Sequence, residues 1–303
     1  ALGTALVTAG SAQAASLSVS GATSIFFQGE DNSDYGNGWS MTDSISFAAS
    51  GEMDNGFTVS TAFELDDGSL DDRSITIDTG DMGSLTFSGS GTSGPIGAWD
   101  DVTPSANEEA HGTNVSGTAA GAANAASSAN RFVYDYTAMD GLAIKAAYTP
   151  SAGTTSVESS TEIGALYTGI DGLTIGVASG TDSGGSVEVD NSTRYITYAY
   201  DAFTFGYQSN SMDSGTAGAD EEFTAYAVSY AVNDDLSISY GYSELDYEGV
   251  STVTDETQEA AAVSISYSMG SMSLSATRAD VDNEGGNKEH DGAGYEINVA
   301  FSF

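Results

Sequence analysis

The carboxyl-terminal stretch of the chain alternates strictly between two kinds of residue. Tyr295, Ile297, Val299, Phe301 and Phe303 are apolar or aromatic, and the residues between them are small or polar. A repeat of two residues is the period of a β-strand, whose successive side chains point to opposite faces. The same alternation recurs along the chain, without a convincing helix or an apolar run of membrane-helix length. Strands that are apolar on one face and polar on the other favour a closed barrel with lipid outside and water inside.

Period-two alternation between turn residues predicts about sixteen strands. Short connections such as Asp140-Gly141 and Asp171-Gly172 alternate with longer acidic or Gly/Ser-rich segments. Asp-Gly pairs favour two-residue hairpins, so we expect tight turns at one end of a barrel and long loops at the other. A soluble β-sandwich would alternate less regularly. The expected strands are 15–29, 39–52, 57–66, 72–79, 84–90, 130–139, 142–149, 159–170, 173–181, 191–201, 202–210, 221–232, 235–246, 256–269, 271–281 and 292–303.

Composition supports this all-β class and excludes several functions. The 303 residues include 37 Gly, 16 Tyr and 12 Phe but only 3 Pro, as expected of many strands and tight turns. There is no cysteine, so a disulfide framework and a thiolate metal site are excluded. Six Lys and Arg against 44 Asp and Glu give a net charge of −38, which would repel nucleic acid. Such a chain tolerates or recruits cations.

Two segments differ from the rest of the chain. Residues 1–14 are small and apolar and end in Ala12-Gln13-Ala14, which indicates the remnant of a secretory signal peptide. Residues 15–303 would then form the barrel domain, although an ordinary N-terminal strand is the alternative for the first segment. Residues 91–129 form the longest connection and the third long loop, and loops of that length are usually functional or disordered.

Residues 72–87 carry a family resemblance. They read as an arginine-led strand, a tight turn Gly80-Asp81-Met82-Gly83 and a second strand. This segment resembles the general trimeric porins of Gram-negative bacteria, most closely the alphaproteobacterial type, with methionine in place of the usual turn aromatic. The arginine that closes this hairpin in the family is absent, because Ser88-Gly89-Ser90 occupies its place. The segment is moderately specific alone and stronger together with the strand count, the third loop and the final phenylalanine.

The resemblance implies a sixteen-stranded transmembrane antiparallel barrel in the outer membrane, among lipid and lipopolysaccharide. It implies a homotrimer in which each chain has its own aqueous channel for passive diffusion of small hydrophilic solutes and ions. The third loop would fold inward and narrow the channel, with its acidic residues facing basic residues on the opposite wall. Phe303 is similar to the family's assembly signal for the barrel-insertion machinery.

Strand parity identifies candidate lumen residues. Glu64 lies between two apolar residues that would face lipid, and the same parity points Arg131, Asp135 and Lys145 inward. A charge facing lipid at the midplane of a barrel costs about 2–4 kcal/mol, which favours this assignment. Structural salt bridges along the wall are the alternative role for each of these residues.

The third loop supplies the candidate constriction. Set against Arg131 and Lys145, its carboxylates would create a transverse field across a narrow aqueous slot. With so few basic groups, we expect the lumen to be net negative and the channel to prefer cations. A solvated charge run is the alternative. The loop carboxylates are those of Asp100, Asp101, Glu108 and Glu109.

Two further basic residues, Arg73 and Arg194, resemble wall arginines of the family and are therefore candidate pore residues. Their parity disagrees, because it places them on the same sides as Ile75 and Ile196. Either a bulge turns them inward, or they lie at the rim or at a subunit contact.

No cofactor or enzyme activity is expected. His111 and His290 both fall in loops without a recognisable catalytic set. Acidic loop clusters could bind Ca²⁺, although no EF-hand spacing is present. A substrate-selective channel, a structural or adhesive surface β-protein without a pore, and a soluble secreted β-protein are the alternative readings. The acidic clusters are Asp66-Asp67 with Asp71-Asp72, and Asp31 with Asp34.

Overall fold

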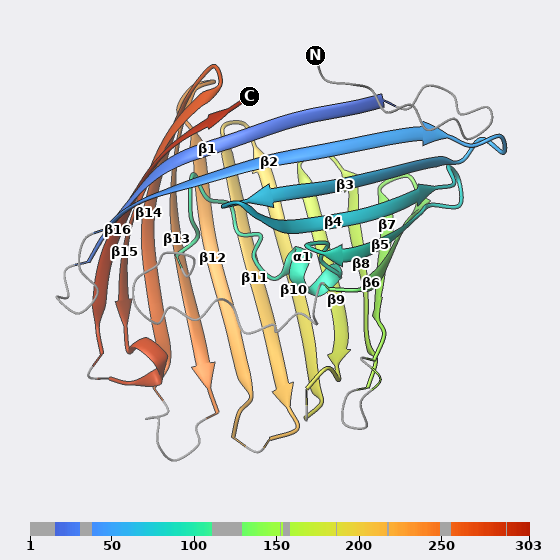
Figure 1. The fold of residues 1–303 in the computed structure, drawn as a ribbon. Helices are drawn as coiled ribbons and strands as arrows, with labels where there is room; N and C mark the ends of the chain where they lie inside the picture. Colours follow the sequence, from blue (N-terminus) through green and yellow to red (C-terminus); the bar gives the residue numbers. More distant parts are fainter. Residues whose placement is uncertain are drawn as a thin grey trace.

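Sixteen antiparallel strands close into a barrel around a short helix (Figure 1). This computed structural model describes residues 16–30, 38–110, 129–151, 153, 158–185, 187–216, 218–248, 256–288 and 290–303. The expectations for residues 1–14, for part of the third loop, and for Asp31, Asp34 and His111 lie outside the described residues. Within the described ranges, no helix is long and apolar enough to cross a membrane.

The elements follow one another around the barrel in chain order. Their bounds are β1 Ser16–Glu30, β2 Gly38–Glu52, β3 Thr58–Asp66, β4 Ser69–Asp78, β5 Ser84–Ser90, α1 Pro95–Trp99, β6 Arg131–Met139, β7 Leu142–Thr149, β8 Ser160–Ile170, β9 Leu173–Asp182, β10 Val189–Tyr200, β11 Phe203–Ser214, β12 Glu221–Ala231, β13 Leu236–Tyr247, β14 Gln258–Met269, β15 Met272–Asp282, the 3-10 turn η1 Glu284–Gly286, and β16 Gly292–Ser302.

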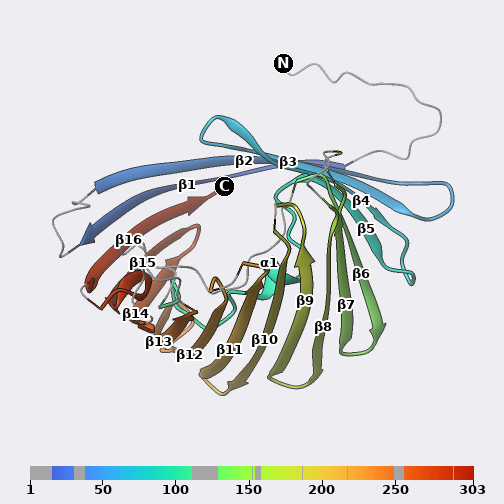
Figure 2. The same cartoon turned by 90° about the horizontal axis from the view of Figure 1, so that it is seen from below.

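The barrel closes where the first strand meets the last. β1 pairs with β16 from Ala22 opposite Ser302 to Glu30 opposite Gly294. Beyond this ladder, the Phe303 N–H donates to the Gly21 carbonyl at 2.9 Å and the Gly21 N–H returns a bond at 3.2 Å. Every strand therefore has two neighbours, and the ring is continuous (Figure 2).

The predicted all-β barrel is confirmed, and each expected strand corresponds to an observed one. The largest difference in a strand start lies at β4, which begins at Ser69 rather than near residue 72. Asp67 and Gly68 have positive φ angles of 45° and 77°, so they form a two-residue turn between β3 and β4. The connection expected over residues 67–71 is therefore shorter, and residues 69–71 belong to β4.

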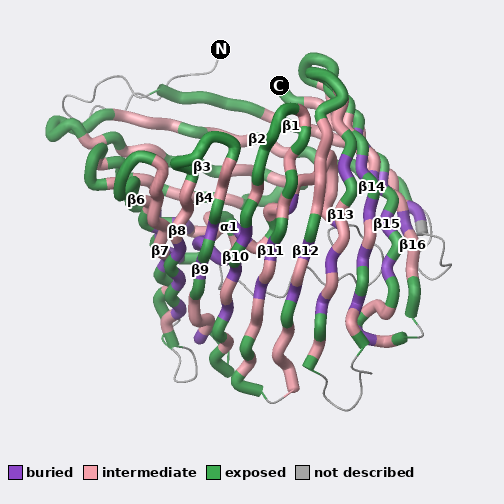
Figure 3. The backbone as a smooth tube through the Cα atoms, turned by 180° about the vertical axis from the view of Figure 1, so that it is seen from behind, coloured by how far each residue is buried: buried purple, intermediate pink, exposed green. Residues whose placement is uncertain are grey.

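The two faces of the wall alternate as the pattern predicted, apart from a few inward apolar residues. Exposed apolar side chains such as Ile265 and Phe205 point outward, and buried polar ones such as Ser264 and Gln208 point inward. Figure 3 shows buried positions recurring between exposed ones along several strands. The inner face is not wholly small or polar, however, because the inward Phe223 on β12, like inward Leu245 and Val281, is buried.

The inner wall carries glycines where residues of the third loop press against it. A β-carbon at Gly164 would lie 2.2 Å from the Trp99 ring and 2.9 Å from a carbon of Pro95. One at Gly206 would lie 2.2 Å from the Pro104 ring. Both distances are far below van der Waals contact, so only glycine allows the loop to approach this closely.

Gly164→Val should destabilise the barrel by about 1–3 kcal/mol, because overpacking displaces α1 from β8. The measurement is the thermal midpoint of β-sheet circular dichroism for the folded protein in detergent. Gly51→Val is the matched control, since nothing lies within 4 Å of a β-carbon there. Equal midpoints for the two variants would contradict the close packing of loop and wall.

Candidate functional site

The chain enters the barrel after β5 and forms α1 against the inner side of β7–β10 (Figure 2). Pro95 occupies the first turn of this helix, where its missing N–H and fixed φ cause no loss. Pro95, Ile96 and Trp99 are buried against the wall. A helix of 5 residues is too short to be stable alone, so its position depends on contacts with the strands.

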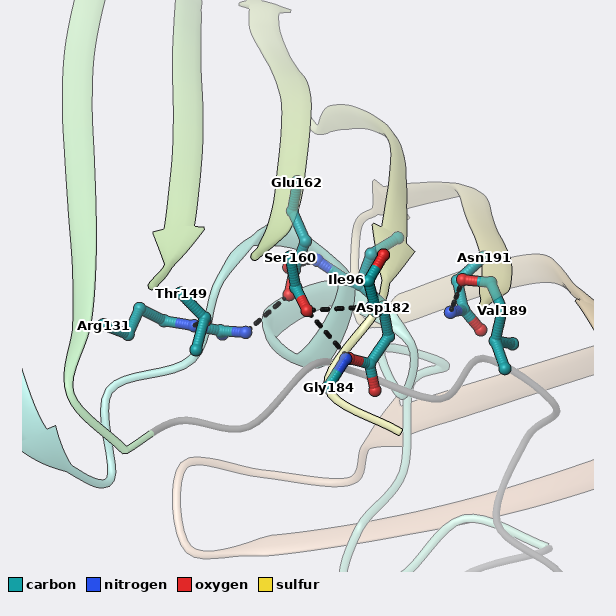
Figure 4. Close-up of polar contacts among 10 residues, drawn as sticks. Ile96, Arg131, Thr149, Ser160, Glu162, Asp182, Gly184, Val189 and Asn191 are labelled. Atoms are coloured by element: carbon teal, nitrogen blue, oxygen red, sulfur yellow. Dashed lines mark hydrogen bonds and ion pairs between the residues drawn. The ribbon is translucent and has the colours of Figure 1, made fainter. Parts of the chain in front are cut away.

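The start of α1 is held by a buried ion pair. The Arg131 guanidinium on β6 lies 2.7 Å from the Glu162 carboxylate on β8, and their side chains are 1% and 3% exposed. The other oxygen of Glu162 accepts the Ile96 N–H at 3.0 Å, and Arg131 Nε donates to Thr149 at 3.0 Å (Figure 4). Burying an ion pair is favourable only when further hydrogen bonds support it, and the bonds to Ile96 and Thr149 supply two of them.

The wall beside this pair is also hydrogen-bonded. Ser160 Oγ donates to the Asp182 carboxylate at 2.8 Å (Figure 4). The same oxygen accepts the Ser183 N–H at 3.0 Å. Asp182 also accepts the Gly184 N–H at 2.9 Å. These bonds join the ends of β8 and β9, and they stiffen the wall that carries Glu162.

The end of α1 is held by three buried side chains of β10 and β11. Gln208 Nε2 donates to the Trp99 carbonyl at 3.0 Å, and its Oε1 accepts the Val102 N–H at 2.9 Å. Thr193 Oγ1 lies 2.9 Å from the same Trp99 carbonyl. Asn210 Nδ2 donates to the Asp100 carbonyl at 2.8 Å. The backbone on either side of Asp101 is thereby fixed to the wall.

The loop then continues along the inner wall as far as β15. Polar side chains of three more strands bond to it, so its path crosses most of one half of the barrel. These bonds are Ala106 N–H to Ser239 Oγ at 2.8 Å on β13, Ser264 Oγ to the Glu108 carbonyl at 3.0 Å on β14, and Asn107 Nδ2 to Thr277 Oγ1 at 2.8 Å on β15. Within the loop, Ser105 donates to the Glu109 carboxylate at 3.0 Å.

The four loop carboxylates follow the inner wall, whereas Arg131 has the alternative role expected of it, that of a structural salt bridge. Asp100 and Asp101 follow α1 at β11, and Glu108 and Glu109 lie near β14. Arg131 does not face them as an exposed wall cation, because it is buried in its pair with Glu162. Strand parity correctly predicted that Arg131 points inward. Its partner Glu162 lies two strands away, and no sequence motif indicates the pairing.

Lys145 and Asp135 lie on the inner face as predicted, and they form an ion pair. Lys145 Nζ is 2.9 Å from the Asp135 carboxylate, and both side chains remain partly exposed. Together with Asp78, Ala98 and Trp99 they line a cavity of about 950 Å³ between α1 and the short turns. Glu64 lies between outward-facing Phe63 and Leu65, so its carboxylate is on the inner face near the β3–β4 turn.

Arg73 and Arg194 are not on the inner wall, which corrects their assignment as pore-lining residues. Arg73 shares the exposed face of Ile75, and its side chain lies over Gly89 of β5. Arg194 shares the outer face of Ile196 and donates to Ser209 at 3.3 Å. Register shifts occur between Arg73 and Ser74 in the β4–β5 pairing, but they do not turn the side chain inward. Parity was therefore right and the likeness to wall arginines was misleading.

Sequence reasoning missed the residues that hold the loop, chiefly Glu162, Thr193, Gln208 and Asn210. Their inward parity was readable, but a partner on a distant loop was not. For the predicted Ca²⁺ clusters, no group of three or more His, Cys, Asp or Glu residues in the described part of the chain is arranged to hold a metal ion.

Comparisons with known proteins agree with this geometry. A family model described as Gram-negative porin matches residues 1–257, whereas no curated protein matches the chain. In vitro folded OmpT of Vibrio cholerae, in its trimer form, is 13% identical with a TM-score of 0.72 over 96% of this chain and 100% of that chain.

Two further solved structures share the fold. A triple mutant of the Rhodopseudomonas blastica porin is 16% identical, with a TM-score of 0.69 over 95% of this chain and 100% of that one. An anion-selective porin from Comamonas acidovorans is 11% identical, with a TM-score of 0.66 over 96% and 100% of the two chains. At these identities the likeness establishes the fold, and the family model covers well over half of the sequence. The chain therefore belongs to the Gram-negative porin family, whose members are outer-membrane β-barrel channels.

Proposed function

We propose that the protein is a passive diffusion channel for small hydrophilic solutes and ions and that it prefers cations. The observation that carries this proposal is where the six basic residues lie. The two on the inner face are each paired with a carboxylate, three lie on the outer face, and one lies in the β15–β16 connection. Arg131 and Lys145 are the two on the inner face. Arg73, Arg194 and Arg278 lie on the outer face, and Lys288 lies in the connection.

The inner face also carries acidic groups on the third loop. Asp100, Asp101, Glu108 and Glu109 follow it along the wall, and Glu64 faces the lumen from β3. When the inward cations are neutralised locally, the surplus charge of the lumen is negative. A low-dielectric wall concentrates such a field, which raises the local concentration of cations and lowers that of anions.

The fold alone does not decide the direction of selectivity. The structure from Comamonas acidovorans bears the name of an anion-selective porin, and it shares this barrel. The preference must therefore come from side chains, and the charges of the inner face support a cation preference. Passive diffusion, without catalysis or a cofactor, is the mechanism that belongs with the porin family.

Assembly as a homotrimer is part of the proposal. The OmpT structure is that of a trimer form. On this chain, the outer face of β1 and β2 exposes Leu17, Trp39 and Met41 at 72%, 74% and 63%. We place the subunit contact on this face, among outer-membrane lipid and lipopolysaccharide. We also propose that residues 1–14 are a signal remnant and that Phe303 is a signal to the barrel-assembly machinery.

In a planar bilayer under a KCl gradient, the reversal potential should have the sign of K⁺ preference. The negative surplus in the lumen is the physical reason. Raising the salt concentration should weaken the preference, because screening shortens the reach of these charges. Zero or Cl⁻-directed reversal potential would refute the cation preference, and absence of single-channel steps would favour a surface protein without a pore.

Lys145→Gln should raise the K⁺-to-Cl⁻ permeability ratio, by about two-fold, because it releases the Asp135 carboxylate into the lumen. Arg194→Gln makes the same change in net charge on the outer face and should leave the ratio unchanged. Reversal potentials of both variants under one KCl gradient provide the measurement. If Arg194→Gln shifts the ratio as much as Lys145→Gln, the assignment of faces is wrong.

Unheated protein in detergent should migrate on a gel as a trimer and convert to a monomer on boiling. Trp39→Asp should abolish the trimer band, since a charge would lie in an apolar subunit contact. Ser46→Asp, on the inner face of the same strand, should retain it. A wild-type protein that migrates as a monomer in both conditions would contradict the trimer.

A further inference from the structure

Three polar side chains of the inner wall meet at one short stretch of the third loop. Thr193, Gln208 and Asn210 are 2%, 0% and 2% exposed, and all three project inward from β10 and β11. Gln208 bridges the turn after α1, since its amide bonds to both the Trp99 carbonyl and the Val102 N–H. We name Thr193, Gln208 and Asn210 the amide clamp.

The amide clamp is also bonded within itself. Asn210 Oδ1 lies 3.1 Å from Gln208 Nε2 and 2.6 Å from Thr193 Oγ1. A Gln or Asn side chain has both donors and an acceptor, so it can satisfy carbonyl and N–H groups at the same time. The internal bonds fix each amide in one orientation, and the loop backbone can bond to it in only one position.

Inward residues of the wall can be buried without polar side chains such as those of the amide clamp. On the next two strands, the inward Ala225 and Leu245 are almost fully buried without any side-chain polar atom. An amide buried without partners would destabilise the protein, so the clamp is useful only with the loop in place. The side chains of the amide clamp are therefore better suited to holding the loop in position than to filling space along the wall.

We infer that the amide clamp positions Asp100 and Asp101, and that it thereby sets the strength of the cation preference. This inference rests on the proposed function. Gln208 holds the residues on both sides of this acidic pair, and Asn210 holds the Asp100 carbonyl itself. Asp101 is exposed between these fixed points, so the backbone that carries its carboxylate is held at one place along the wall. Gln208, Asn210 and Thr193 are positioning residues, because they act on ions only through Asp100 and Asp101.

A spin label reports the position of the loop without reference to ion flow. The chain has no cysteine, so Ala98→Cys introduces a single thiol on the exposed side of α1. Gln208→Leu keeps the approximate volume and removes both bonds to the loop. The label should become more mobile in folded Gln208→Leu protein than in the parent protein with Gln208 intact.

Gln258→Leu is the matched control for this substitution. Gln258 is also buried and inward, but it bonds to Tyr247 and to the Gly285 N–H of η1 rather than to the loop at α1. The label should keep its original mobility in this variant. Thr193→Val is a second, near-isosteric variant, and it should also make the label more mobile. It provides the test if Gln208→Leu does not fold.

Ion selectivity tests the consequence. Gln208→Leu should lower the K⁺-to-Cl⁻ permeability ratio about two-fold or more, and it should have no further effect in an Asp100→Asn and Asp101→Asn background. The inference is overturned if the label stays immobile in both clamp variants, or if Gln208→Leu lowers the ratio equally without the two carboxylates. A wild-type channel without cation preference refutes the proposed function instead, while the label still decides whether the clamp holds the loop.

Discussion

A strand that faces hydrocarbon must have its backbone N–H and C=O groups bonded to other strands, because lipid offers them no partner. The ladder between β1 and β16 meets this requirement by joining the two ends of the sheet. Closure removes both edges, and it separates the side chains into an outer and an inner set. The inner side chains can then be polar, and they can contact the third loop or line water. All the functional features depend on this separation of the side chains into two faces.

Within the barrel, charge and position are supplied by different residues. Arg131 and Glu162 are buried as a pair, and Glu162 also accepts the first N–H of α1, that of Ile96. A lone charge at that depth would be costly, so the guanidinium makes Glu162 tolerable as an anchor. The consequence is that one of the two inward cations serves the loop and contributes little to the field in the lumen. Under the proposed function, carboxylates further along the loop dominate that field.

The sequence predicted the strands well because period-two alternation and Asp-Gly turns are local properties. It predicted side-chain facing at Lys145 and Glu64 for the same reason, and parity also gave the outward side for Arg73 and Arg194. It could not supply the pairing of Arg131 with Glu162, because that contact depends on the register of β6, β7 and β8. The contacts of Gln208 depend on the path of a loop more than a hundred residues away in the chain.

The chemistry of the clamp is consistent with a separation between holding the loop and setting its charge. A lysine or arginine at position 208 could donate to the Trp99 carbonyl, but it could not accept the Val102 N–H. It would also place a positive charge beside Asp100 and weaken the field of that carboxylate. A carboxylate at position 208 could accept the N–H group but would repel the carbonyl. An amide can bind both backbone groups without adding charge, so the position of the loop and the sign of its field can be set independently.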